Sequence, residues 1–282
     1  MTRHVRLREL LVGIEGLALL RHLYDGTDEA AEARLAEVRR VLDDEAFASG
    51  DLTPEADVRD AYRSWSETYD DPGNQIIALE EPLVWRLLEP IPPGCALDAA
   101  CGTGRHARRL VGLGHEVLGI DLTPEMLRRA AENVPEARFV EGDLRKIPAD
   151  DAQFDLVVCG LALAHLPDLD PGVRELARVL KPGGRLVVSA LHPLQVHLGW
   201  QAPFSDASGN RAFAREHPHT HADYLRAFRT VGLSVLECFE PEFGLEQMPS
   251  KRRAFEHMPE ATIAAYAGLP AVLIWNLEKG TG

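Results

Sequence analysis

The first ninety residues place apolar side chains at helical spacing. A first helix is predicted by apolar residues three or four positions apart, at Leu7, Leu10, Leu11, Ile14, Leu17 and Leu20. After a polar break at residues 25–28, a second helix with Thr27 or Asp28 as its N-cap is predicted by the same spacing at Leu35, Val38, Val41 and Leu42. A third helix is expected to start at Thr53-Pro54-Glu55 and to run to Tyr69, and a fourth to cover residues 75–88.

From residue 95 onward, short apolar runs alternate with helical stretches. The runs that predict strands fall at residues 95–98, 116–120, 137–140, 154–159, 185–191, 233–239 and 271–277. Helical periodicity between the earlier runs falls at residues 104–113, 124–133 and 171–180. This alternation is typical of an α/β protein with a doubly wound, mostly parallel sheet. We therefore expect a helical N-terminal extension or lid over residues 1–90 and an α/β domain over residues 91–282.

Acidic residues and glycines follow several of the predicted strands. Asp98 and a loop with Gly102 and Gly104 come after the first strand, Asp121 ends the second, and Asp143 follows the third. In a doubly wound sheet the ligand lies at the carboxyl ends of the strands, so we expect these residues to meet there. The glycine loop alone also fits a nicotinamide dinucleotide site. Asp155 opens a strand at the opposite edge, where we expect a structural role.

The chain resembles the class I S-adenosylmethionine-dependent methyltransferases, small-molecule type. The matching motifs are Leu97-Asp98-x-x-Cys101-Gly102-Thr103-Gly104, Gly119-Ile120-Asp121, Gly142-Asp143, Phe154-Asp155-Leu156-Val157 and Leu180-Lys181-Pro182-Gly183-Gly184. Their order and spacing are the family's, whereas the dinucleotide alternative leaves Gly142-Asp143 and Pro182-Gly183-Gly184 unexplained. The resemblance implies a Rossmann-like sheet of seven strands whose last strand is antiparallel. One departure is that Ala99 and Ala100 stand where the family usually has a glycine.

The resemblance also implies which residues contact S-adenosyl-L-methionine. Gly102 and Gly104 would lie against its methionine portion, Asp121 would hold the ribose, and Asp143 would read the adenine edge. Leu122 and Leu144 would enclose the adenine ring. Further cofactor-binding residues are expected on the same loops and on the predicted lid: Tyr69, Asp98, Ala100, Arg105, Met126, Gly142, Cys159 and Leu161.

Composition argues against several classes of partner. The formal net charge is −14, and no run of Lys and Arg offers a phosphate backbone a basic face, so we expect no nucleic-acid partner. The N-terminal apolar stretch carries too many charges for a signal peptide or a membrane span, so we expect no membrane partner. The four cysteines lack metal-ligand spacing, and we expect buried free thiols at Cys95, Cys159 and Cys238. A cytoplasmic protein fits these features.

Histidines supply the candidates for a general base. His165 follows the fourth predicted strand, His192 follows the fifth, and His219 lies in a cluster with His217 and His221. A base is needed only where the methyl acceptor must lose a proton, and packing is the alternative role for each ring. No Cys or carboxylate with matching spacing joins the cluster, so no metal site is expected.

The acceptor is expected to be a small molecule with a sizeable nonpolar portion. Residues 195–215, with Trp200, Phe204 and Phe213, form a connection long enough to build a substrate wall. Tyr62, Trp65 and Tyr69 are candidates for an aromatic lid near the sulfonium, with packing on the sheet as the alternative. The Asn-Pro-Pro-Tyr motif of enzymes that methylate nucleic-acid bases or glutamine amides is absent after Cys159.

Two hypotheses for function follow. The first is S-adenosylmethionine-dependent methyl transfer to an O, N or C nucleophile of a small organic molecule, such as a specialised metabolite. The alternative is a protein of the same fold that binds the cofactor without transferring the methyl group, as a cyclase-like enzyme or a binding module. The first two helices either form a homodimer contact or cover the sheet of their own chain.

Overall fold

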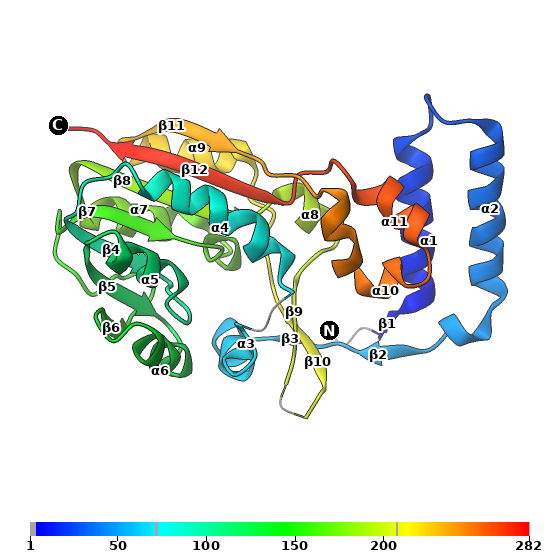
Figure 1. Ribbon diagram of the computed structural model, residues 1–282, viewed down its shortest axis with the longest axis horizontal. Coiled ribbons are helices and arrows are strands. Elements are labelled where there is room, and N and C mark those ends of the chain that lie inside the picture. Colours follow the sequence, from blue (N-terminus) through cyan, green and yellow to red (C-terminus); the bar gives the residue numbers. More distant parts are fainter. Residues whose placement is uncertain (1–3, 71–72, 207, 282) are drawn as a thin grey trace.

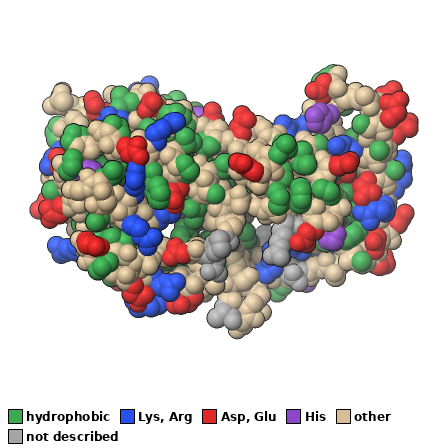
Figure 2. Space-filling model, viewed as in Figure 1, with side chains coloured by type: hydrophobic (Ala, Val, Ile, Leu, Met, Phe, Trp, Pro, Cys, Tyr) green, Lys and Arg blue, Asp and Glu red, His purple; other side chains and the backbone are tan. Residues whose placement is uncertain are grey.

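The computed structural model describes residues 4–70, 73–206 and 208–281. A seven-stranded sheet with helices on both faces forms one part of the molecule (Figure 1). A group of helices lies beyond one end of this sheet, and a small three-stranded sheet lies between the two parts (Figure 1). On the described part of the face shown in Figure 2, acidic and basic side chains are interspersed.

The large sheet has the strand order β11-β12-β8-β7-β4-β5-β6. Its strands are β4 (Cys95–Ala99), β5 (Glu116–Asp121), β6 (Arg138–Glu141), β7 (Phe154–Cys159), β8 (Leu180–Leu191), β11 (Leu233–Phe239) and β12 (Val272–Lys279). Strands β4 to β8 pair in parallel, and β12 is antiparallel to both of its neighbours. The expected Rossmann-like topology, with an antiparallel last strand, is confirmed. The strand order reverses at β4, which is where a doubly wound sheet binds its ligand.

Two hydrophobic cores cover the two faces of this sheet. Alternate strand residues supply them: Leu97 and Val157 face one core, whereas Ala96 and Val158 face the other. The first core is covered by α7 (Leu169–Val179) and α9 (His221–Thr230). The second is covered by α4 (Gln75–Leu88) and α5 (Arg105–Gly112), and α6 (Pro124–Asn133) packs beside β5 and β6. Burial on both faces explains why these strands are continuous apolar runs.

The separate helical group combines segments from both ends of the chain. It consists of α1 (Leu7–Arg21), α2 (Asp28–Asp43), the 3₁₀ helices η1 (Glu45–Phe47) and η3 (Leu245–Ser250), α10 (Arg252–Phe255) and α11 (Pro259–Tyr266). Helix α1 packs against α2, α10 and α11, the last two of which lie between β11 and β12 in the sequence (Figure 1). Thr27 caps α2 as expected, by accepting a hydrogen bond from the Ala30 N–H. The division into residues 1–90 and 91–282 stays a prediction.

The predicted third helix was wrong at both ends. Strand β3 (Glu55–Ala56) occupies its expected start, and the Pro54 carbonyl accepts a hydrogen bond from the Phe213 N–H at 3.1 Å. Helix α3 (Val58–Trp65) begins only after Asp57, whose side chain accepts from the Arg59 N–H, and it ends four residues before Tyr69. The local signal at Pro54 was overridden by pairing with strand β10, which lies more than 150 residues away.

The small sheet has the order β3-β10-β9, with β9 (Ala202–Ser205) and β10 (Arg211–Ala214) forming a hairpin. The remaining elements are β1 (His4–Arg6), β2 (Gly50–Leu52), the 3₁₀ helix η2 (Leu163–His165) and α8 (Pro193–His197). No described helix has the length and hydropathy needed to cross a membrane. All four cysteines are free, and Cys159 is buried as expected. Cys95 is only half-buried and Cys238, on the edge strand β11, is exposed, so the expected burial of these two was wrong.

The side chain of Arg21 joins α1 to the end of α11. Its Nη1 donates to the carbonyl oxygens of Ala264, Ala265 and Ala267 at 2.9–3.2 Å, which leaves these helix-end acceptors satisfied. We expect Arg21→Met to lower the free energy of unfolding by about 1–2 kcal/mol. Denaturant titration measures the change. Arg39→Met, which removes an exposed charge on α2, is the control, and equal losses in the two variants would contradict the role of Arg21.

Candidate functional site

The loop from β4 to α5 requires backbone conformations that favour glycine. Gly102 has φ +52° and Gly104 has φ +88° at the N-cap of α5. A Cβ on Gly104 would lie 3.3 Å from the Val134 side chain, so this position is also crowded. Ala100, one of the two alanines that stand where the family usually has a glycine, adopts φ +60°, a left-handed conformation. Such strain costs about 1–2 kcal/mol per residue.

Asp121 holds this loop from the end of β5. Its Oδ2 accepts a hydrogen bond from the Gly102 N–H at 2.9 Å, and its Oδ1 accepts from the Thr123 N–H at 2.8 Å. Burial raises the pKa of Asp121, and these backbone donors act in the opposite direction. Each carboxylate oxygen keeps a lone pair for a further donor, so the group can accept both hydroxyls of a ribose.

The other two predicted carboxylates have different surroundings. Asp98 is 1 % exposed, and its Oδ2 accepts from the Ala107 N–H at 2.8 Å. Its Oδ1 is buried without a partner among the described residues. Asp143 accepts hydrogen bonds from Arg145 on both oxygens, and these bonds lower its pKa. Reading an adenine edge with Asp143 therefore requires it to share its oxygens with Arg145.

The remaining predicted cofactor residues lie around the same strand ends. Leu122 is half-buried, Leu144 is buried, and a Cβ on Gly142 would lie 2.8 Å from Pro148. Met126 and Cys159 are fully buried, and burial raises the pKa of the Cys159 thiol far above its usual range. The cofactor contacts assigned to all of these residues stay predictions.

A buried carboxylate that the sequence interpretation missed lies behind the loop. Glu80, on α4, is fully buried and accepts hydrogen bonds from Arg105 at 2.5 Å, His106 at 3.1 Å and Ser189 Oγ at 2.7 Å. Burial alone would raise its pKa, but the charges and hydrogen bonds of His106 and Arg105 outweigh that effect and lower it to about 2. Arg105, expected to bind the cofactor, is thus ion-paired with Glu80.

This cluster also reaches the end of β7. Ser189 Oγ and the Ser189 carbonyl both accept from the Leu161 N–H, at 3.1 and 2.9 Å. Leu161 has φ +55°, a conformation that is costly for a branched side chain and that needs surrounding support. A Cβ on the preceding Gly160 would lie 2.6 Å from His106 Nε2, so only glycine fits against the cluster. One carboxylate therefore supports both the glycine loop and Leu161.

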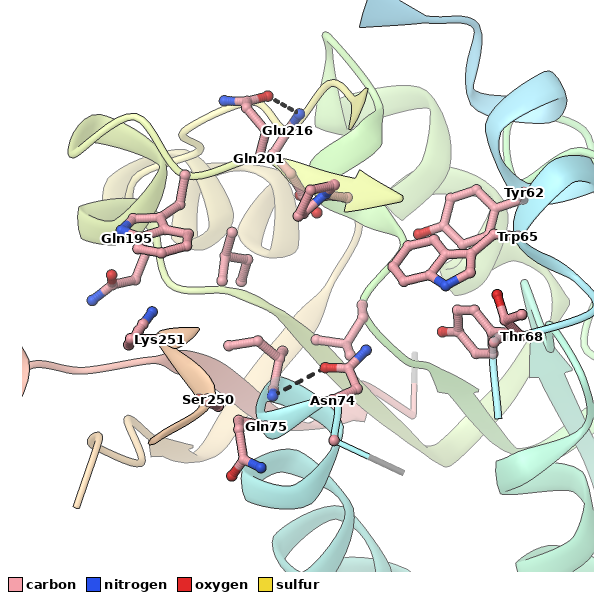
Figure 3. Close-up of a pocket in the computed structure, with 18 of the residues that line it drawn as sticks. Tyr62, Trp65, Thr68, Asn74, Gln75, Gln195, Gln201, Glu216, Ser250 and Lys251 are labelled. Atoms are coloured by element: carbon pink, nitrogen blue, oxygen red, sulfur yellow. Dashed lines mark hydrogen bonds between the residues drawn. The ribbon is translucent and has the colours of Figure 1, made fainter. Parts of the chain in front are cut away.

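A cavity of about 390 Å³ adjoins this edge of the sheet (Figure 3). Tyr62, Trp65, Tyr69 and Leu161 line it, and the role of the three aromatic residues as a lid stays a prediction. The connection after β8 supplies Gln195, Trp200, Gln201, Ala202 and Pro203, which agrees with the expected substrate wall. Phe204 stacks behind Trp65 with ring centroids 6.4 Å apart, and Phe213 is not a lining residue.

Tyr69 lies between the glycine loop and the cavity. It lines the cavity, and its ring is the nearest group to the position of a Cβ on Gly102, at 3.9 Å. Burial raises the pKa of Tyr69 to about 12, so its hydroxyl keeps its proton at neutral pH. The two binding regions thus meet at one aromatic ring.

His165 lies beside the cavity in contact with two of its lining residues. Its Nδ1 donates to the Arg215 carbonyl at 2.7 Å, so in the neutral ring Nε2 accepts from the Tyr62 hydroxyl at 2.8 Å. Glu216 Oε1 is 3.8 Å from the same Nε2. Glu216 Oε2 has no partner among the described residues, and burial raises the pKa of this carboxyl.

The other predicted histidines point elsewhere. His219 Nε2 donates to the Leu166 carbonyl at 2.7 Å, and His192 Nε2 bonds Glu240 at 2.8 Å, while neither residue lines the cavity. Their catalytic roles stay predictions. His192, His221 and Glu240 are close enough to hold a metal ion. However, His192 Nδ1 accepts from the Leu194 N–H, which places the proton of the neutral ring on Nε2 and directs it to Glu240.

Known proteins match the region that carries the glycine loop. The family model described as "Methyltransferase domain" matches residues 97–188. A malonyl-[acyl-carrier protein] O-methyltransferase from Erwinia pyrifoliae is 38 % identical over 144 residues, which are 49 % of this chain and 55 % of that protein. A demethylmenaquinone methyltransferase from Lactobacillus johnsonii is 32 % identical over 168 residues, which are 54 % of this chain and 68 % of that protein.

The chain belongs to the class I S-adenosylmethionine-dependent methyltransferase family. An S-adenosylmethionine-dependent methyltransferase from Mesorhizobium loti shares the fold, with a TM-score of 0.54 and 24 % identity over 72 % of this chain and all of that one. The chain spans little more than half the length of the first curated relatives that it matches. The glycine conformations, the free lone pairs of Asp121 and the orphaned Asp98 Oδ1 fit the family's cofactor.

The Glu80 cluster predicts a large loss of stability when its charge is removed. We expect Glu80→Gln to lower the free energy of unfolding by about 3–5 kcal/mol, because Arg105 would be left without its buried partner. The difference in the free energy of unfolding between the variant and the unmodified protein should become smaller as the pH falls from 4.5 towards about 2. Over that range Glu80 is ionised in the folded state and protonated in the unfolded state, so the stability that its charge provides is lost. Denaturant titrations at several pH values measure both effects.

The adjacent Glu81 provides a matched control. It also lies beside Arg105, at 3.5 Å, but it is partly exposed. We expect Glu81→Gln to change stability by less than about 1 kcal/mol. Similar losses in the free energy of unfolding for the two variants would contradict a stabilising role that depends on the burial of Glu80.

Proposed function

We propose that this protein transfers the methyl group of S-adenosyl-L-methionine to an O, N or C nucleophile of a small organic molecule. The observation that supports this proposal best is the place of Tyr69, whose ring lines the cavity and lies 3.9 Å from the position of a Cβ on Gly102 in the glycine loop. Methyl transfer is an in-line displacement, so the donor and the acceptor must be held next to each other. A donor loop and an acceptor cavity that share one ring meet this requirement.

The chain's own residues would bind the cofactor around the strand ends. Asp121 would accept the ribose hydroxyls, the backbone at Gly102 and Gly104 would lie against the methionine portion, and Leu122 and Leu144 would enclose the adenine. When bound, the cofactor supplies an electrophilic methyl carbon on a sulfonium. Tyr62, Trp65 and Tyr69 present aromatic rings beside this region, and such rings attract a positive charge.

The acceptor that fits the cavity has a sizeable nonpolar portion, as a specialised metabolite does. The volume of about 390 Å³ is typical of sites for small organic molecules, and the lining is rich in aromatic and aliphatic side chains. The curated relatives are named for methyl transfer, which favours transfer over a cyclase-like or binding role. Their printed acceptors belong to those proteins, and the shared region covers about half of this chain.

We further propose that Glu216 is the general base for an acceptor that must lose a proton. Its side chain is buried, lines the cavity and carries an unpartnered oxygen, and its raised pKa makes it a stronger base than an exposed carboxylate. His165 Nε2, which accepts from the Tyr62 hydroxyl, lies 3.8 Å from Oε1, the other oxygen of Glu216.

The remaining proposals concern location and assembly. Four free thiols suit a reducing compartment such as the cytoplasm. Helix α1 buries Leu11, Ile14 and Ala18 within its own chain, but Leu20, Leu23 and Tyr24 near its end are exposed and are available for a homodimer contact.

Cofactor binding tests the proposed function. We expect Asp121→Asn to weaken the binding of S-adenosylhomocysteine by about ten- to hundredfold, because an uncharged amide is a poorer acceptor for the ribose hydroxyls. Isothermal titration calorimetry measures this affinity. Asp155→Asn is the control, since Asp155 pairs with Lys181 at the opposite edge of the sheet and its loss should leave the affinity unchanged. No heat for the unmodified protein with either S-adenosylmethionine or S-adenosylhomocysteine would refute the proposal.

Turnover tests the role of Glu216. With an acceptor found by screening hydroxyl and amine compounds for S-adenosylhomocysteine release, we expect Glu216→Gln to lower kcat about a hundredfold or more. The binding of S-adenosylhomocysteine should stay unchanged. In the unmodified protein, the rate should rise with pH through a value above the ordinary carboxyl pKa of 4.5, because only the ionised group can take a proton. A variant with unaltered kcat would eliminate Glu216 as the base.

A further inference from the structure

A lysine lies among aromatic rings at the end of the cavity opposite the lid. Lys251 lies in the turn between η3 and α10 and lines the cavity. Its Nζ is 3.7 Å from the centroid of the Trp200 ring, 4.0 Å from that of Phe243 and 4.8 Å from that of Tyr266. Figure 3 shows Lys251 and Gln195 on one side of the cavity, and Tyr62 and Trp65 on the other.

The surroundings of Lys251 are held in place by other contacts. Trp200 Nε1 donates to the Tyr266 hydroxyl at 3.1 Å, which joins the connection after α8 to helix α11. The backbone N–H of Trp200 donates to the backbone carbonyl of Gln195 at 3.0 Å. The side-chain Nε2 of Gln195 donates to the Pro270 carbonyl at 2.8 Å. Two of the three rings around the ammonium, Trp200 and Tyr266, are therefore held by bonds that do not involve the lysine itself.

Lys251 has no anionic partner among the described residues. No carboxylate of the described residues lies within salt-bridge distance of its Nζ, and the acidic lining residue, Glu216, lies 3.8 Å from His165 instead. Burial alone lowers the pKa of Lys251 to about 7. The rings offset part of the cost of burying the ammonium but supply no hydrogen-bond acceptor for its three protons.

We propose that Lys251 binds the carboxylate of the acceptor, which is therefore an organic acid with an apolar skeleton. The acid would lie along the cavity with its carboxylate at the Lys251 end and its methyl-accepting atom at the Tyr69 end. An ammonium that the protein has already removed from water gains more from an incoming anion than an exposed lysine does. The aromatic walls between the two ends match an aromatic or polycyclic skeleton. This inference rests on the proposed function, because it names the class of acceptor for the same site.

Two probes of nearly equal shape, one anionic and one neutral, test directly whether the cavity prefers a carboxylate. We expect 2-naphthoate to bind about ten- to hundredfold more tightly than the neutral 2-naphthamide, as a hydrogen bond to a charged group provides. Isothermal titration calorimetry at about pH 6 keeps both the lysine and the carboxylate charged. The titrations are made with and without S-adenosylhomocysteine, so that the affinity for each probe is measured whether or not the protein binds the cofactor.

Variants locate the preference at Lys251. We expect Lys251→Met to bind the two probes with similar affinity, while Lys251→Arg retains the preference for the acid. Lys251→Gln serves the same purpose if the methionine variant does not fold, as judged by circular dichroism. Arg229→Met is the control, because it removes an exposed positive charge on α9 outside the cavity and should leave both affinities within about twofold.

The outcomes separate this inference from the proposed function. Equal binding of the two probes by the unmodified protein, no binding of either, or a preference that survives in Lys251→Met and Lys251→Gln would overturn the role of Lys251. If S-adenosylhomocysteine binds normally in those samples, the proposed function stands. A clear preference for 2-naphthoate in a protein that binds no S-adenosylhomocysteine would instead support the anion site and contradict methyl transfer.

Discussion

The buried carboxylate of Glu80 is the group on which both sides of the site depend. It holds Arg105 and His106 at the start of α5, directly after the glycine loop, and it accepts from Ser189 on β8. Through Ser189 it fixes the backbone of Leu161, which lines the cavity in a left-handed conformation. A single carboxylate from α4 therefore supports two segments with left-handed backbone, and its hydrogen bonds with Arg105 and His106 keep its own pKa low.

The cavity is built from parts of the chain that pack together only in the folded molecule. One side of it comes from α3 and the residues after it, one wall comes from the connection between β8 and β10, and its far end comes from the helical group beyond the sheet. Arg21 anchors α1 to the end of α11, whose Tyr266 in turn bonds the Trp200 ring over Lys251. The N-terminal helices thus contribute to the Lys251 end of the cavity indirectly, through α11.

Helices and strands whose signal lies in their own residues were predictable from the sequence. Helix α4 at residues 75–88, helix α6 at residues 124–133 and strand β11 have the expected bounds, because each has a clear period and a clear break at its ends. Strand β3 was missed because its partner β10 is remote in sequence. Glu80 and Lys251 were missed for a related reason. A Glu in an amphipathic helix and a Lys in a polar stretch look solvent-exposed until distant segments enclose them.

The cavity and the cofactor loop occupy different stretches of the chain. The region that the family model matches, residues 97–188, contains the glycine loop, Asp121 and Asp143, but of the described cavity residues it contains Leu161 alone. Substitutions that reshape the cavity therefore fall almost entirely outside the residues that the family model matches. During divergence, such a chain can change the compound that it recognises while its donor site stays intact. In this chain the residues that carry the family resemblance are thus separate from almost all of those that shape the cavity.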